Sequence, residues 1–243
     1  MVDLASTTVV ITGAASGIGF ALANGFLDDG ARVVAADIDA DGMAPLEARG
    51  ALVMPTDVTC EAEVERLVAA AVEQTGRLDV LFNNAGVGGG STVASAPAGA
   101  FERSIAVMLF GPYYGMRAAI PVMKQQNFGR IINTLSRHAE SAQVGANAYS
   151  AAKAGLWALE RSAAHEVERY DILINGLIPG HTQSAMTRNA KNFEDLQKPE
   201  AVYPTARMLA TLPADGPRGK VFWNLAEYPL FDPVNPTYWR SAV

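Results

Sequence analysis

Tyr149 and Lys153 are the residues of this chain whose types and spacing point most directly to chemistry. They stand at positions i and i+4, so a helix places both on one face. A phenol has a pKa of about 10, too high for a base at neutral pH, but an ammonium about 4 Å away contributes roughly 4 kcal/mol at an effective dielectric near 20. The pair predicts acid–base chemistry at a hydroxyl or carbonyl group, with Tyr149 moving the proton. Ser136, thirteen residues earlier, is a candidate to hydrogen-bond the same oxygen. A surface pair is the alternative for this spacing taken alone.

A glycine-rich turn indicates a phosphate-binding site near the N-terminus. Residues 12–19 read T-G-A-A-S-G-I-G and lie between a β-branched run and a helical stretch. Glycines at such a turn allow the backbone to approach a phosphate closely, and the helix N-terminus supplies free N–H groups. The spacing G-x-x-x-G-x-G differs from the commoner G-x-G-x-x-G, so an ordinary strand–helix turn is the alternative.

Two acidic residues indicate which cofactor such a site prefers. Asp37 follows the next β-branched run, about twenty residues after the glycines, where a carboxylate accepts hydrogen bonds from ribose hydroxyls and repels a 2′-phosphate. No Lys or Arg stands within the turn or directly after Asp37, which favours NAD over NADP. A turn or helix cap is the alternative for Asp37. Asp57, after the third run, is placed either to meet the adenine edge or to form an Asx-turn.

These residues need a scaffold that brings strand ends together, and the chain predicts one. The expected strands are 7–11, 32–36, 52–54, 80–83, 130–134, 172–177 and 221–225, and the expected helices are 17–29, 61–74, 100–125 and 149–169. Repeated β-α-β alternation predicts one α/β domain over 1–243, with a Rossmann-type, doubly wound parallel sheet. Residues 184–213 are too long for an ordinary loop and are expected to form a small helical lid. The tail 227–243 is rich in proline and aromatic residues and is expected to pack on a surface, such as a neighbouring subunit.

Jointly, these motifs resemble those of the short-chain dehydrogenases/reductases. The matching pieces occur in order over residues 7 to about 190: the turn at 12–19, Asn83-Asn84-Ala85-Gly86, Ser136, Tyr149 with Lys153, and Asn175 with Pro179-Gly180. The resemblance implies an oxidoreductase that transfers a hydride between NAD(H) and a secondary alcohol or ketone, with Ser136, Tyr149 and Lys153 as catalytic residues. An NADP-dependent carbonyl reductase is the alternative within the family. The cofactor-binding residues that the resemblance implies are Gly13, Ser16, Gly17, Ile18, Gly19, Asp37, Asp57, Val58, Asn84, Ala85, Gly86, Tyr149, Lys153, Pro179, Gly180 and Ser184.

The chain departs from the family pattern at Met108. The family usually has an asparagine there, which by resemblance helps to hold a proton-relay water beside the lysine. A thioether is a weak acceptor and no donor, so this relay cannot form through Met108. A catalytically weak nucleotide-binding sensor or scaffold is therefore a second alternative. The last strand also lacks the family's usual acidic residue and two glycines, and continues into Ala226-Glu227-Tyr228-Pro229.

The substrate-facing residues are the least defined by sequence. His138, two residues after Ser136, is a candidate to bind a polar group or to assist proton transfer, with a solvated loop histidine as the alternative. Met186 in the expected lid is a second substrate candidate, and His181 could flank the nicotinamide. His165 is expected on a solvated helix face. The three histidines have no metal-ligand spacing, so no metal site is predicted.

Composition limits the remaining classes of function. The 243 residues carry a net charge of -6 and no basic run, which argues against nucleic acid or an anionic membrane as partner. The single cysteine, Cys60, fits a reducing compartment, and no signal peptide or uncharged membrane-length run is recognised. We expect a soluble cytoplasmic enzyme with a small-molecule substrate. The resemblance further implies a homo-oligomer, a tetramer or dimer.

Overall fold

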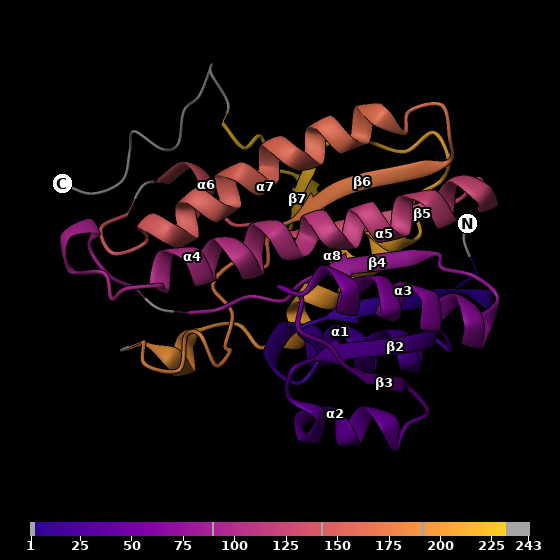
Figure 1. The fold of residues 1–243 in the computed structure, drawn as a ribbon, viewed down its shortest axis with the longest axis horizontal. Coiled ribbons are helices and arrows are strands. Elements are labelled where there is room, and N and C mark those ends of the chain that lie inside the picture. The colour runs from indigo at the N-terminus through magenta and orange to yellow at the C-terminus, as the bar shows by residue number, and fades with distance from the viewer. Residues whose placement is uncertain (1–2, 89, 142, 191, 232–243) are drawn as a thin grey trace.

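One central sheet organises the chain, shown by a computed structural model that describes residues 3–88, 90–141, 143–190 and 192–231. Within these residues the strand order is β3-β2-β1-β4-β5-β6-β7-β8 (Figure 1). All neighbouring strands are parallel except β8, which runs antiparallel to β7. The strands are β1 (Thr8–Thr12), β2 (Arg32–Asp37), β3 (Leu52–Pro55), β4 (Val80–Asn83), β5 (Gly129–Thr134), β6 (Ile172–Leu177), β7 (Val221–Trp223) and β8 (Ala226–Glu227). The predicted doubly wound parallel sheet is confirmed.

Helices cover both faces of the sheet. The α-helices are α1 (Gly17–Asp28), α2 (Ala40–Glu47), α3 (Glu61–Thr75), α4 (Ala100–Ile105), α5 (Gly111–Gln126), α6 (His138–Ser141), α7 (Asn147–Glu166) and α8 (Tyr203–Ala210). Helices α1, α2 and α8 pack together on one face, and α3, α5 and α7 pack on the other. The strands are buried on both faces, which is why they read as continuous apolar runs rather than alternating ones.

The first core lies between the sheet and the helices α1, α2 and α8. Phe26 of α1 packs against Phe82 of β4 and meets the ring of Tyr203 of α8 edge-on, with centroids 5.3 and 5.1 Å apart. On the opposite face, Leu67 of α3 and Met116 of α5 belong to a second buried cluster. These two layers hold the sheet rigid, so that the loops after its strands are presented in a fixed arrangement.

The chain reverses its direction of winding between β1 and β4, which are neighbours in the sheet. In open α/β sheets the crevice for a ligand lies at such a switch point, beyond the carboxyl ends of the strands. Thr12 and Asn83 end these two strands, and Asn84 joins them by donating from its Nδ2 to the carbonyl oxygen of Thr12 at 3.0 Å. The expected ligand-binding edge of the sheet is therefore well defined.

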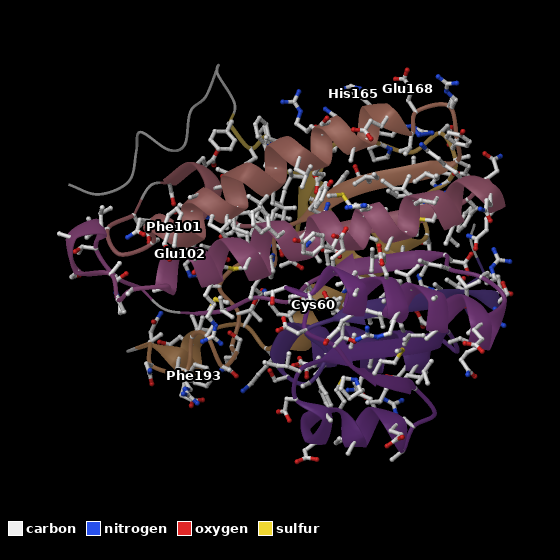
Figure 2. The ribbon with its side chains drawn as sticks, viewed as in Figure 1. Cys60, Phe101, Glu102, His165, Glu168 and Phe193 are labelled. Atoms are coloured by element: carbon white, nitrogen blue, oxygen red, sulfur yellow. The ribbon has the colours of Figure 1, made fainter. Side chains whose placement is uncertain are left out.

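The expected lid over residues 184–213 divides into two parts. Its C-terminal part forms a 3-10 helix, Pro199–Val202, and α8, whose Ala206, Leu209 and Ala210 belong to the first core. These residues are part of the helical layer and not of a lid, because α8 buries an apolar face against the first core. In the sequence, the polar residues around α8 make this apolar face hard to recognise. Only the part before residue 199, with the 3-10 helix Phe193–Asp195, stands apart from the layers, and Figure 2 shows Phe193 at the outer end of this segment.

The single helix expected over 100–125 is divided by five residues, Ala106–Phe110, in π-helical conformation. Taken as one stretch, Ala100–Gln126 is the only helix in the described residues that is long and apolar enough to cross a membrane, which is weak evidence by itself. Its Met116, Ala119 and Met123 lie in the second core, packed among α3 and the sheet. This burial accounts for part of its apolar character, since a third of the stretch is buried in the fold.

Candidate active site

A cleft of about 530 Å³ opens at the carboxyl ends of β1, β4, β5 and β6. It brings together residues that lie as far apart in the sequence as Gly13 and Trp223, as the switch-point argument requires. The predicted site residues that line it are Gly13, Ser16, Gly17, Ile18, Gly19, Asp37, Asn84, Gly86, Ser136, His138, Tyr149, Lys153, Pro179, Gly180, Ser184 and Met186.

The glycine-rich turn packs so tightly that side chains are excluded from it. Gly13 has a φ of +71°, and a Cβ there would lie 2.7 Å from Cα of Ala85. A Cβ at Gly19 would lie 2.0 Å from the carbonyl oxygen of Gly13. The turn therefore leaves its backbone N–H groups and the N-terminus of α1 facing the cleft, which is the arrangement that binds a pyrophosphate.

Asp37 ends β2 beside this turn. Its Oδ2 accepts a hydrogen bond from the backbone N–H of Ala15 at 3.0 Å, and its Oδ1 accepts from that of Asp39 at 3.1 Å. Each carboxylate oxygen retains a free lone pair, and the side chain lines the cleft. Asp37 thus links the glycine-rich turn to β2 and also presents a negative charge where a ribose would lie.

Three of the implied cofactor residues do not line the cleft. The Oδ1 of Asp57 accepts from the backbone N–H of Thr59 at 2.9 Å, which is the Asx-turn left open by the sequence. Val58 is buried and packs against Gly111 of α5. Ala85 donates its N–H to Oγ1 of Thr12 at 3.2 Å. Their contacts in this structure are with the protein, and a role in cofactor binding stays a prediction.

Ser136, Tyr149 and Lys153 meet at the base of the cleft. Ser136 follows β5, and Tyr149 and Lys153 lie on one face of α7, as predicted. The side chains of Ser136 and Tyr149 are hydrogen-bonded to each other. The Nζ of Lys153 lies 5.7 Å from the centre of the Tyr149 ring and donates to the carbonyl oxygen of Thr134 at 2.6 Å. The three residues are thus assembled without any other ionisable partner for Lys153 among the described residues.

The electrostatics differ from the sequence argument. Burial raises the pKa of Tyr149 above its usual value, and the hydrogen bond with Ser136 opposes this only in part. Burial also lowers the pKa of Lys153 to about 8. The net depression of the Tyr149 pKa that the sequence suggested is therefore not found in this structure, because burial dominates, and the Lys153 ammonium donates to the carbonyl oxygen of Thr134.

Met108 lies within the π-helical segment and is completely buried at the side of the cleft. A π-helical turn is wider than an α-helical one and is frequent at functional sites. A Cβ added to Gly86 would lie 3.7 Å from Sδ of Met108, so the thioether stands beside the loop that follows β4. An apolar atom thus occupies this wall of the cleft.

The substrate end of the cleft holds a group of residues that follow β5 and β6. The ring of His138 meets that of Tyr149 edge-on with centroids 5.8 Å apart, and its Nδ1 is buried without a hydrogen-bond partner in the described residues. Burial, and then the positive charges of His181 and Arg137, lower the pKa of His138. His138 is thus a cleft residue, whereas His165 is exposed on α7, on the opposite side of the molecule from Phe193 (Figure 2).

Among the cleft residues that sequence reasoning missed, three have large or polar side chains near the substrate end. Trp223 ends β7, Gln143 lies between α6 and α7, and Glu140 belongs to α6. Glu140 is buried and accepts hydrogen bonds from the hydroxyl of Tyr228 and the backbone N–H of Phe231, both at 2.6 Å. Trp223 could have been predicted as a cleft residue, because it lies near the carboxyl end of an expected strand, on the side where the cleft opens. Described residues 227–231 of the tail pack here, and the rest of the expected tail lies outside the described residues. No group of three or more potential metal ligands forms in the described part of the chain.

Comparisons with known proteins agree with this geometry. A family model described as short chain dehydrogenase matches residues 7–195. The uncharacterized oxidoreductase YxjF of Bacillus subtilis is 37% identical over 78% of this chain and 75% of its own length, and levodione reductase of Leifsonia aquatica is 34% identical over 79% and 75%. Among solved structures, the 3-ketoacyl-(acyl-carrier-protein) reductase of Brucella melitensis complexed with NADH superposes with a TM-score of 0.84 at 28% identity, covering 90% of this chain and 96% of that one.

Proposed function

The chain belongs to the short-chain dehydrogenase family and is an oxidoreductase acting on alcohol or carbonyl groups; we propose that it transfers a hydride between NAD(H) and a secondary alcohol or ketone, with Tyr149 as the acid–base residue. One observation carries the proposal: Ser136, Tyr149 and Lys153 meet at the base of a cleft whose other end is the glycine-rich turn. Proton transfer and hydride transfer must occur on the two ends of one C–O bond, so both sites have to open into one cavity.

The residues at the turn fit a dinucleotide. Gly13 and Gly19 leave no room for side chains, so a pyrophosphate could approach the backbone closely and be held by the N–H groups at the N-terminus of α1, since those of Ala14 and Ala15 already donate to Ala36 and Asp37. Asp37 would accept hydrogen bonds from the adenosine ribose and disfavour a 2′-phosphate, which is the reason for proposing NAD(H) over NADP(H). Lys153 and Asn84 would hold the nicotinamide end. The bound nicotinamide supplies or accepts the hydride.

The protein residues handle the proton and the developing charge. Because burial raises the pKa of Tyr149, the phenol is protonated at neutral pH and can donate to a carbonyl oxygen that receives a hydride on its carbon. Ser136 hydrogen-bonds the same oxygen as negative charge builds on it. The charged Lys153 stabilises the tyrosinate that remains. This arrangement favours carbonyl reduction near neutral pH.

The second candidate is a nucleotide-binding protein with little turnover. The observation in its favour is Met108, which is fully buried and offers no hydrogen-bond donor beside the cleft. The two candidates differ in one measurable property, which is NADH oxidation with a broad panel of ketones. Turnover of any ketone that depends on Tyr149 excludes the second candidate.

Tyr149→Phe tests the proposal directly. It removes the proton donor and keeps the ring, so it should lower kcat by at least about a hundredfold while NADH affinity changes little. Tyr170→Phe is the matched control, because Tyr170 lies two residues before β6, at the amino ends of the strands and outside the cleft. Retention of most of the activity by Tyr149→Phe would show that another group supplies the proton.

The remaining proposals concern assembly and location. Phe101, Phe110 and Tyr113 are large side chains on α4, the π-helical segment and α5 that remain partly exposed. Apolar surface of this kind favours a homo-oligomer, a dimer or tetramer, which light scattering can test. The one cysteine, Cys60, is exposed, which suits a reducing cytoplasm (Figure 2).

A further inference from the structure

The substrate end of the cleft is lined by three basic side chains. Arg137 and His138 follow β5, and His181 follows β6. Arg137 and His181 both lie close enough to His138 to lower its pKa, and the Arg137 guanidinium supplies a permanent positive charge beside the two imidazoles. This group is separate from the glycine-rich turn, because the turn follows β1 and β4 lies between β1 and β5 in the sheet.

No ion pair in the described residues joins a carboxylate to Arg137, His138 or His181. Arg137 forms no ion pair there; its guanidinium stacks over the Trp223 ring, 5.2 Å from the centroid. The nearest carboxylate on the same helix, Glu140, already accepts hydrogen bonds from Tyr228 and Phe231. Tyr149 and Lys153 on α7 also line the cleft beside His138, and neither carries a negative charge at neutral pH, so Glu140 is the carboxylate that shares this end of the cleft.

The chemistry of these side chains selects a type of ligand group. A guanidinium presents paired N–H donors that match a planar carboxylate. His138 offers a buried Nδ1 without a partner in the described residues, and protonation of its ring makes both nitrogens donors. An uncharged substrate would leave the charge of Arg137 without a partner, whereas an anion can accept hydrogen bonds from both Arg137 and His138.

We propose that the substrate is a short oxo acid or hydroxy acid whose carboxylate is bound by Arg137 and His138 beside the reacting carbonyl. The proposal rests on the proposed function, since it names the substrate class of the same cleft. His138 lies next to Tyr149, with ring centroids 5.8 Å apart, so the carboxylate and the carbonyl must belong to a short chain. His181, which is exposed at the cleft, adds to the attraction without closing the entrance.

Binding of an unreactive pair of ligands separates this inference from catalysis. Pentanoate and pentanamide have nearly the same shape and differ in charge, and calorimetry with NADH-saturated protein measures both. The wild type should bind pentanoate at least about tenfold more tightly, since charge-assisted hydrogen bonds are about twice as strong as neutral ones. Arg137→Gln should remove most of this preference and Arg137→Lys should retain part of it.

Arg161→Gln is the matched control. Arg161 also stacks on a tryptophan, with its guanidinium 4.8 Å from the centre of the Trp157 ring, but it lies outside the cleft. This variant should keep the full preference for pentanoate. Undetectable or equal binding of the two ligands by the wild type, or a preference that survives Arg137→Gln, would overturn the inference.

A kinetic comparison completes the test. The ratio of kcat/KM for 4-oxopentanoate to that for its methyl ester should fall in Arg137→Gln and stay constant in Arg161→Gln. If neither compound is reduced by the wild type and no other ketone is, the proposed function fails, while the calorimetric result still decides whether the cleft binds carboxylates.

Discussion

Glu160 is expected to make the stability of this protein fall as the pH rises. It lies on α7, two turns after Lys153, and is completely buried. Its Oε2 accepts a hydrogen bond from Nδ2 of Asn133 at 3.0 Å, while its Oε1 has no partner in the described residues. Burial raises the pKa of Glu160 from 4.5 to about 8. The folded chain therefore holds a proton there that the unfolded chain releases.

The sign and size of the effect follow from this pKa. Because the folded pKa is raised, the contribution of Glu160 is fully present below pH 4.5 and is lost as the pH rises to about 8. A difference of about 3.5 units corresponds to on the order of 5 kcal/mol. Gln at position 160 stays neutral and keeps an acceptor for Asn133, but its amide N–H groups lack partners, which costs about 1–3 kcal/mol at every pH. Glu160→Gln should therefore be less stable than the wild type near pH 5 and more stable near pH 9.

Urea unfolding at pH 5, 7 and 9, at one protein concentration, measures this crossover. Glu166→Gln is the control, since Glu166 is exposed on the same helix and should show no crossover. The difference between the wild type and Glu160→Gln should change by about 2–4 kcal/mol across this range, somewhat less than the full pKa difference allows. A difference that stays constant within about 1 kcal/mol would refute the reasoning, because it would mean that Glu160 is not protonated in the fold.

Two further predictions concern the cleft. In a fluorescence titration, Asp37→Asn should reduce the ratio of the NADPH and NADH dissociation constants about tenfold or more, since it removes the charge that repels a 2′-phosphate. Equal affinities for the two cofactors in the wild type would refute the preference for NAD(H). With a neutral ketone, His138→Ala should lower kcat at least about tenfold, as expected for the loss of an acid–base partner. Adding Met108→Asn to this variant should restore part of the lost kcat, so the effects of the two substitutions should be non-additive. Wild-type turnover by His138→Ala would make His138 irrelevant to proton transfer.

The strands were predictable because they are buried on both faces. Val9, Val10 and Ile11 of β1 are fully buried, so a parallel central strand has no polar positions to confuse the pattern. The motif residues are then fixed by topology, since they follow strand ends that meet at one edge of the sheet. Ser136, Tyr149 and Lys153 were brought together for this reason, although thirteen residues separate the first two.

The elements that sequence missed depend on local detail. Helix α2 (Ala40–Glu47) was not expected, because a proline inside a short stretch argues against a helix and Pro45 lies within it. The helix is nevertheless capped at its start, where Oδ1 of Asp39 accepts a hydrogen bond from the backbone N–H of Gly42. The spacing of apolar residues does not predict the π-helical segment around Met108, because one extra residue in a helical turn only displaces the apolar positions that follow it by one. The extent of the lid was wrong because α8 is short and its apolar face is recognised only against Phe26.

The pKa of Tyr149 differs from the sequence-based expectation for a general reason. Spacing on a helix tells which side chains are neighbours, but a pKa depends equally on how much water surrounds them. Lys153 is buried with a carbonyl oxygen as its hydrogen-bond acceptor, and Met108 brings no polar group to the cleft, so little offsets the cost of the ammonium. With its pKa near 8, Lys153 loses its charge in mildly alkaline solution. The stabilisation of a tyrosinate is lost with it, and alcohol oxidation, which needs Tyr149 to accept a proton, gains little from raising the pH. In the mechanism proposed above, this pair would favour the reductive direction at neutral pH, where Tyr149 is protonated and Lys153 is still charged.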